Sequence, residues 1–141
     1  MTAKQYLNQI RELEKEIEFK KSYIEQLRAI AEKSTSIISP TSSSCSNDSK
    51  LENCIVKIAD AEAEISREIE ELLNKQKEIR HTIAEIDDSD IIRILELRYI
   101  LGMRWEEAEI FSGYSERHIM RLHAQGLALI DEILKKRKDG S

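Results

Sequence analysis

The sequence predicts an all-α protein, made of a long antiparallel helical hairpin (coiled coil) followed by a C-terminal three-helix unit. Its 141 residues include only 4 Gly and 1 Pro, which is too few turn-forming residues for a β-sandwich or a series of β-hairpins. Two long stretches repeat apolar residues at steps of 3 and 4, a pattern typical of helices that pack along a seam. We place the hairpin in residues 1–88 and the three-helix domain in residues 89–141.

The first helix is predicted from a seam of about four heptads. Good helix formers fill the positions between the seam residues, and neither Gly nor Pro interrupts the chain before Pro40. The seam has one polar interruption, at Lys20. Its apolar members are Ala3, Tyr6, Ile10, Leu13, Ile17, Ile24, Leu27 and Ala31.

A Ser-rich segment follows, at residues 34–50, and its composition indicates a loop or flexible linker. Asp48 or Ser49 is expected to cap the next helix, with Glu52 completing a capping box. Cys45 and Cys54 have neither metal-type spacing nor a second pair, so we interpret both as free thiols.

The second helix has a more regular seam, in which only Glu62 and Gln76 are polar. At about 1.5 Å per residue the two helices reach roughly 46 and 54 Å, so the Ser-rich loop can fold them back on each other. One hairpin covers only a narrow stripe on each helix, and we therefore expect a homodimer or higher homo-oligomer through the hairpin. The seam residues are Leu51, Ile55, Ile58, Glu62, Ile65, Ile69, Leu72, Gln76, Ile79, Ile83 and Ile86.

The charge distribution separates the two halves of the chain. The net charge of −5 argues against coating nucleic acid by bulk charge, and residues 51–88 hold 11 acidic and 5 basic side chains. A charge run on a coiled coil is usually a solvated face, although docking of a basic partner protein is the alternative. Residues 114–138 instead hold six basic and three acidic side chains, with two His.

Residues 89–141 predict three helices. Ser89 is expected to cap the first, which ends at Gly102, and the second runs from about Arg104 to Ser112 and ends at Gly113. The third begins near Ser115 and continues into a basic tail. A short helix, a Gly turn and a longer helix predict a helix-turn-helix. We expect Tyr114, Ile119 and Leu122 to pack inward against Trp105, Ile110 and Phe111.

That packing leaves one face of the third helix exposed, namely Glu116, Arg117, Met120, Arg121 and Ala124. A Ser115–His118 nucleophilic pair lacks a buried acid to orient the His, and His118 and His123 are spaced five apart, unlike a zinc-binding helix pair. We therefore expect no enzyme activity, no catalytic residues, no metal and no cofactor. Ser115 is instead expected to cap the third helix, beside a phosphate.

The stretch "LELRYILGMRWEEAEIFSGYSERHIMRLHAQGLALI" resembles region 4 of bacterial sigma factors. Over nearly its whole length the chain is similar to small phage-encoded late transcriptional regulators of the ArpU and RinA type. The resemblance implies a DNA-binding unit that switches on phage late genes in a bacterial cytoplasm. Glu109 and Ser112 depart from that pattern. They predict either a second helix that is rotated to turn Ala108 and Phe111 inward, or a loss of some packing or DNA affinity.

The sequence thus predicts a DNA-binding transcription regulator whose partner is double-stranded DNA. Arg117 and Arg121 would read guanine or bond phosphate, and Glu116 would accept from cytosine. The alternatives are a protein-interaction adaptor that contacts RNA polymerase and a DNA-packaging recognition subunit. No apolar run approaches the length of a membrane span, so we expect a cytoplasmic protein without membrane contact. The full predicted site comprises Arg104, Ser115, Glu116, Arg117, His118, Met120, Arg121, His123, Lys135 and Lys136.

Overall fold

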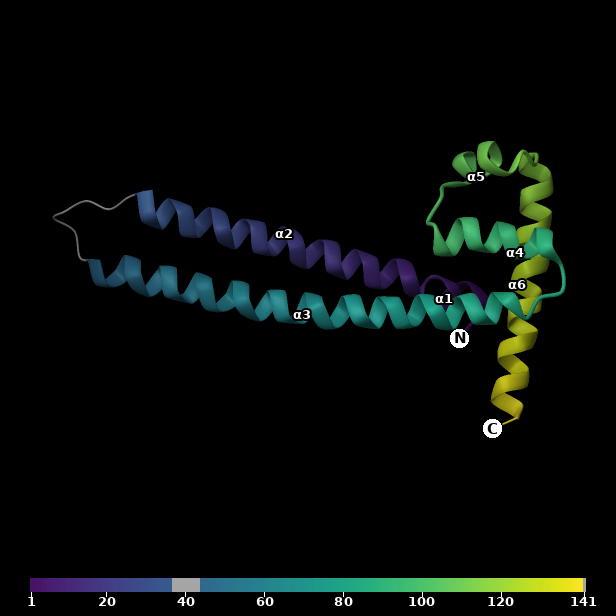
Figure 1. Ribbon diagram of the computed structural model, residues 1–141, viewed down its shortest axis with the longest axis horizontal. Coiled ribbons are helices and arrows are strands. Elements are labelled where there is room, and N and C mark those ends of the chain that lie inside the picture. The colour runs from purple at the N-terminus through teal and green to yellow at the C-terminus, as the bar shows by residue number, and fades with distance from the viewer. Residues whose placement is uncertain (37–43, 141) are drawn as a thin grey trace. The chain divides into compact units, whose positions relative to one another are not determined.

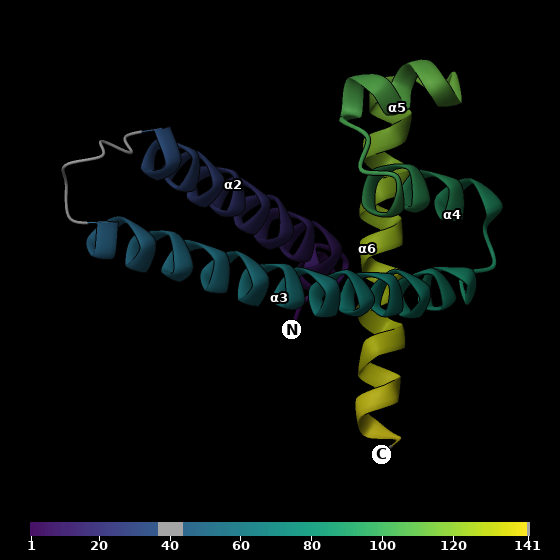
Figure 2. The same cartoon turned by 60° about the vertical axis from the view of Figure 1, so that its left-hand side comes forward.

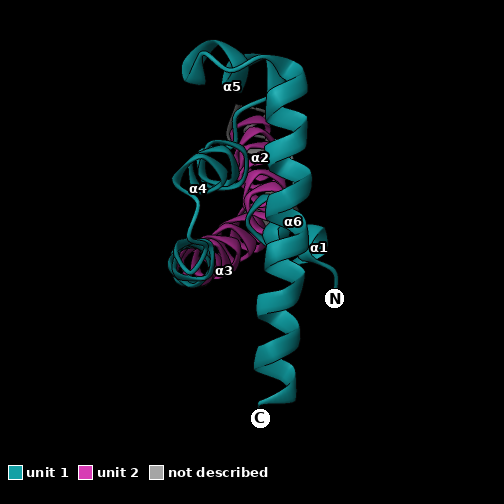
Figure 3. Cartoon of the chain, turned by 90° about the vertical axis from the view of Figure 1, so that its right-hand side faces the viewer, with its two compact units in different colours: residues 1–12, 72–141 teal, residues 13–71 magenta. Residues whose placement is uncertain are grey.

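The computed structural model describes residues 1–36 and 44–140, although it leaves out the side chains of 34–48. Every element in the described part is a helix, which confirms the all-α prediction. The chain forms two compact units: unit 1 contains Met1–Glu12 and Leu72–Ser141, and unit 2 contains Leu13–Glu71 (Figure 3). Each unit is described by itself below.

Unit 2 consists of two long helices that run in opposite directions. They are most of α2 (Gln9–Ser36) and the first part of α3 (Ser44–Ala84) (Figure 1). Ile17, Ile24 and Leu27 of α2 are buried, as the first seam predicts. Arg28 of α2 bonds Glu62 of α3 at 2.8 Å.

In this unit the second seam lies one position before the predicted one at every other step, whereas Leu51, Ile58 and Ile65 are partly buried as predicted. Cys54 and Ala61 are buried, whereas Ile55 and Ile69 are 56% and 40% exposed. Lys20 of α2 explains the shift, because it bonds Glu68 and also lies 3.2 Å from Glu64. The polar interruption of the first seam thus meets an acidic side chain of the second, at the position next to Ile69.

The predicted boundaries of the Ser-rich loop need correction. Helix α2 continues to Ser36 and α3 begins at Ser44, so helical structure covers both ends of the predicted 34–50 loop. Asp48 and Ser49 therefore lie inside α3 and do not cap it. Residues 37–43, the centre of the predicted loop, and the side chain of Cys45 lie outside the described residues. Cys54 is a buried free thiol.

The helices of unit 1 pack around one apolar core. Helix α1 (Ala3–Leu7), the end of α3, α4 (Ser89–Leu95), the π-helical turn η1 (Glu96–Ile100), α5 (Trp105–Ser112) and α6 (Glu116–Asp139) make up this unit (Figure 2). Residues far apart in sequence meet in this core, from Leu7 and Ile10 to Ile79 and Ile83, and to Ile119 and Ile130 further along the chain.

Hydrogen bonds attach the N-terminus to the rest of unit 1. The backbone N–H of Ala3 donates to Asp131 Oδ1 of α6 at 2.7 Å, and the Tyr6 hydroxyl donates to Glu78 at 2.8 Å. Arg137 of α6 donates to Thr82, which is fully buried, at 2.9 Å, and to Glu85 at 2.7 Å. Burial raises the pKa of Tyr6, which stays a neutral hydrogen-bonding group at physiological pH.

Helix α4 starts and ends differently from the expectation. Its N-cap is Asp88, whose side chain accepts from the backbone N–H groups of Asp90 and Ile91, so Ser89 is the first helical residue and the predicted cap is wrong by one position. At the other end the wide π turn places Leu97 in the core and leaves Leu101 62% exposed. The helix ends before Gly102, whose φ is +69°.

Candidate nucleic-acid interface

The turn between α5 and α6 has the predicted boundaries. Gly113 adopts the left-handed conformation, with φ at +77°, and its N–H bonds Glu109 at 3.0 Å. A side chain at this φ would be strained, so glycine suits the position. Two residues later the Ser115 hydroxyl accepts from the His118 N–H at 3.2 Å and caps α6, which confirms the predicted cap.

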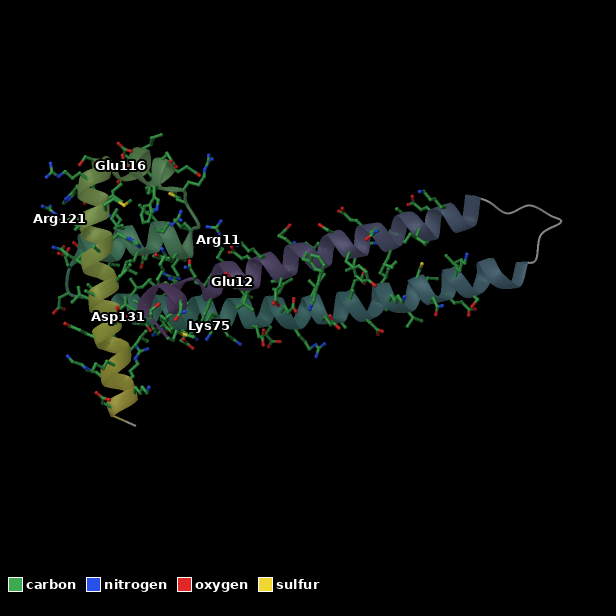
Figure 4. All side chains as sticks on the ribbon, turned by 180° about the vertical axis from the view of Figure 1, so that it is seen from behind. Arg11, Glu12, Lys75, Glu116, Arg121 and Asp131 are labelled. Atoms are coloured by element: carbon green, nitrogen blue, oxygen red, sulfur yellow. The ribbon has the colours of Figure 1, made fainter. Side chains whose placement is uncertain are left out.

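The first half of α6 has one buried and one exposed face. Ile119 and Leu122 are buried, as predicted. Exposed are Glu116, Arg117, Met120, Arg121 and Ala124, which is the expected outward set. Arg121 extends from α6 on the side away from α4 (Figure 4). This half of the helix therefore offers a surface to a partner.

A chain of polar and aromatic contacts orients one arginine of this surface. Arg121 Nη2 donates to His118 Nδ1 at 2.7 Å. The His118 ring meets the Tyr114 ring edge-on, with centroids 4.9 Å apart, and the Tyr114 hydroxyl donates to Asp90 Oδ1 at 2.6 Å. The bond to the Asp90 carboxylate raises the pKa of Tyr114, so the hydroxyl remains a donor. The Arg121 side chain is thus positioned by His118 of α6, which in turn packs on Tyr114 and through it is linked to Asp90 of α4.

The N-terminus of α6 forms an open hollow of about 500 Å³ that Ser115, Arg117, His118 and Arg121 line. Arg117 has no hydrogen-bond or ion-pair partner among the described residues. Two guanidinium groups and the free N–H groups of a 24-residue helix meet here, and both favour a negatively charged oxygen ligand. Glu116 in the first turn is the one acidic side chain of the outward set, so the surface combines two donors with one acceptor.

Arg104 occupies a different position from the rest of the predicted site. It precedes α5 as its N-cap residue, and its Nε donates to Glu107 Oε1 at 2.8 Å. That bond raises the pKa of Arg104 and lowers the pKa of Glu107, as in an ordinary surface ion pair. Its charge is therefore already partly matched within α5.

His123 faces inward. Its Nε2 lies 2.7 Å from the Tyr99 hydroxyl, and its ring meets the edge of Trp105 with centroids 4.7 Å apart. Burial lowers the pKa of His123 below its ordinary value, and the nearby charges of Lys4 and Arg98 act in the same direction. A neutral, half-buried imidazole packs α6 against η1 and α5.

Lys135 and Lys136 are exposed near the other end of α6. Twenty residues of helix, or roughly 30 Å, separate them from Ser115. Lys136 lines a different hollow, together with Glu85, Asp87, Asp88 and Glu132. The structure thus does not bring the basic tail together with Arg117 and Arg121.

The expected packing of α5 is wrong for two residues. Ile110 and Phe111 are 84% and 66% exposed, whereas Ala108 is fully buried. Of the rotated arrangement that Glu109 and Ser112 predicted, Ala108 does face inward and Phe111 does not. The Trp105 ring packs against the Arg98 guanidinium, whose Cζ lies 4.7 Å from the ring centroid.

Two residues that support the surface were not predicted to do so. Asp90 was not among the predicted site residues, and Tyr114 was expected only to pack inward. A tyrosine at the start of a surface helix with an acidic residue 24 positions earlier gives no local signal, because only the fold brings them together.

No protein family, curated protein or solved structure matches the chain. Within residues 1–36 and 44–140, none of the helices has the length and apolar character that crossing a membrane requires. No group of three or more potential metal ligands occurs in the same part of the chain.

Proposed function

We propose that the protein is a sequence-specific DNA-binding transcription regulator that reads the major groove with the N-terminal half of α6. In this proposal α2 and α3 form a coiled-coil hairpin, and α5, Gly113 and α6 form a helix-turn-helix. The observation that carries it is the hollow of Ser115, Arg117, His118 and Arg121 at the exposed start of α6.

The roles follow from the position of each side chain. Arg121, held by His118, is oriented for a bidentate contact to guanine, which is worth about 1–3 kcal/mol of base discrimination. Arg117 and the N–H groups at the Ser115 cap would hold the phosphate backbone. Glu116 would accept from cytosine, and Met120 would contact the thymine methyl group or the sugar edge.

The other predicted residues are left out of the proposed contact surface. His123 is used in packing, Arg104 is paired with Glu107, and the tail lysines lie roughly 30 Å away along the helix. The resemblance to region 4 of sigma factors and to phage late regulators supports a role in activating late genes of a phage in the bacterial cytoplasm.

The experiment is binding by fluorescence anisotropy to the duplex that the protein selects from a random library, over a range of salt concentrations. The parent is compared with Arg117→Ala/Arg121→Ala and with Lys135→Ala/Lys136→Ala, which removes the same charge from the same helix. We expect the first variant to lose the preference for the selected duplex over random duplex, and the slope of its salt dependence to fall by about one phosphate contact, that of Arg117.

We expect the tail variant to keep that preference. Circular dichroism checks that all three proteins have the same helical content. Undiminished selectivity in the Arg117→Ala/Arg121→Ala variant would exclude this surface as the reading element.

A second function, an adaptor that contacts another protein such as RNA polymerase, is favoured by one observation. Ile110 and Phe111 form an exposed apolar pair on α5, next to Glu106 and Glu107. If no duplex is selected even at low salt, the adaptor becomes the preferred function.

A further inference from the structure

The exposed pair on α5 forms a short acidic and apolar ridge, which consists of Glu106, Glu107, Ile110 and Phe111. All four side chains are exposed, and Ile110 is 84% exposed. At 100° per residue they span an arc of about 140° on the helix surface, and the buried Ala108 lies outside that arc. An aromatic and a branched aliphatic side chain at this level of exposure are typical of a protein contact surface.

A groove elsewhere in unit 1 has the complementary chemistry. It has a volume of about 620 Å³ and lies between the last turns of α3 and η1. Leu73, Ala84 and Ile100 supply apolar lining, and Lys77, Arg80 and His81 supply basic and imidazole groups. Gln76 and Glu96 complete the lining.

The ridge and the groove both have apolar surface, and their charges are opposite in sign. Leu73 and Ile100 can cover Ile110 and Phe111, while Lys77 and Arg80 face the carboxylates of the ridge. Lys77 and Arg80 have no ion-pair partner among the described residues, so both cations are available. Duplex DNA is a poor occupant of the ridge, because its phosphates would meet the Glu106 carboxylate and the apolar pair Ile110 and Phe111, while Glu107 is paired with Arg104.

The ridge of one chain cannot dock in the groove of the same chain. Helix α5 is fixed to α6 and η1 through a different face, where Ala108 is fully buried. Turning Ile110 and Phe111 toward the groove would pull Ala108 out of the core. An α5 helix that docks in this groove must therefore come from another molecule.

We propose that α5 of one copy of this chain docks in the groove of a second copy. The two surfaces differ, so the contact is heterologous, and repeated use of it builds a ring or an open chain of copies. Every residue of this contact belongs to unit 1. The contact requires no nucleic acid.

The test is sedimentation velocity of the full-length protein over a wide concentration range, without DNA. The ridge variant is Ile110→Ser/Phe111→Ser, and the groove variant is Lys77→Glu/Arg80→Glu. Each alone should weaken the association at least about tenfold, the usual result of removing a central apolar anchor or a complementary charge pair. Lys135→Glu/Lys136→Glu, with the same change of charge on exposed residues of α6, should associate as the parent does.

Mixing the two variants gives the decisive result. The ridge variant keeps an intact groove and the groove variant keeps an intact ridge, so the mixture should form a complex that stops at one copy of each. Three results would overturn the proposal: a parent that shows no self-association, variants that associate like the parent, or a mixture that gains no complex. Both variants retain Arg117 and Arg121, so these results do not depend on whether the chain binds DNA.

Discussion

At the scale of single residues, Gly126 shows how closely α4 approaches α6. It is buried in the middle of α6, and a Cβ atom there would lie 3.0 Å from both Ile91 Cγ2 and Leu95 Cδ1. That is closer than ordinary van der Waals contact, so any side chain must displace the Ile91 and Leu95 side chains of α4. Glycine costs helix propensity at this site, and close packing of α4 is what offsets the cost.

We predict that Gly126→Val lowers the free energy of unfolding by about 2 kcal/mol, within the usual range for overpacking a core. The control is Ala124→Val, two residues earlier on the exposed face of the same helix, which should cost only about 0.5 kcal/mol through helix propensity. Urea denaturation of the two variants and the parent measures both values. Equal losses of unfolding free energy in the two variants would mean that α4 and α6 accommodate a side chain at residue 126 without strain.

His123 makes the stability of unit 1 depend on pH. Its pKa is lowered in the folded protein, so the unfolded chain binds a proton more readily. The stabilisation from a neutral His123 is complete above the ordinary pKa of 6.5, and is lost as the pH falls through that value toward the lower folded pKa. We predict that the unfolding free energy falls between pH 7.5 and pH 5, and falls less in His123→Gln. Parallel pH profiles for the two proteins would show that other groups cause the change.

At the scale of helices, Lys20 and Glu68 form a polar layer in the seam between α2 and α3. The second oxygen of Glu68 is buried and has no hydrogen-bond partner among the described residues. Removing Lys20 would leave the whole carboxylate unmatched, whereas replacing both residues by apolar ones removes the charges together. The bond to Glu68 raises the pKa of Lys20, consistent with a charge-paired ammonium group.

We therefore predict a rank order for thermal melting followed by circular dichroism. Lys20→Met should melt below the parent, and Lys20→Met/Glu68→Met should melt above that single variant. Lys21→Met is the matched control, since Lys21 is exposed and pairs only with Glu18 of its own helix, and it should melt with the parent. A double variant that melts no higher than Lys20→Met would remove the pairing as the cause.

The same pair explains how far the helices could be predicted from sequence. The spacing of apolar residues at steps of 3 and 4 located both long helices. The same spacing is satisfied equally well by Ile55 and Ile69 and by the residues that precede them, Cys54 and Glu68. Apolar counting chose the isoleucines, and the choice failed because the partner of Lys20 lies on the other helix. Three helix ends in residues 89–141 were better predicted, because Gly102, Gly113 and Ser115 act through their own backbone or neighbouring atoms. The caps expected at Asp48 or Ser49 and at Ser89 were wrong.

The candidate site divides in the same way. The exposure of Arg117 and Arg121 followed from periodicity along one helix. The inward turn of His123 depends on Tyr99, and the exposure of Ile110 and Phe111 depends on which face of α5 the core can accept. Ala108 is small enough for the close contact, so the larger side chains remain outside.

At the scale of the whole molecule, the core of unit 1 crosses the boundary that the sequence suggested at residue 88. Seven of the fifteen buried residues in this core come before residue 89. Fully burying one large apolar side chain contributes about 1.5–3 kcal/mol, and a domain is stable by only about 5–15 kcal/mol in total. The three C-terminal helices therefore depend on the N-terminus and the end of α3. These seven residues are Ala3, Tyr6, Leu7, Ile10, Ile79, Ile83 and Ile86.

We predict that the fragment of residues 89–141 does not unfold cooperatively on its own, whereas the full chain does. The fragment also lacks Thr82 and Glu85, so Arg137 loses both of its partners. A weaker version of the same change, Leu7→Ala in the full chain, should cost about 2–5 kcal/mol, because Leu7 is completely buried. Leu101→Ala is the control, since Leu101 is 62% exposed and should cost far less. Thermal and urea unfolding measure all four proteins, and a sharp transition in the fragment would establish residues 89–141 as an independent domain.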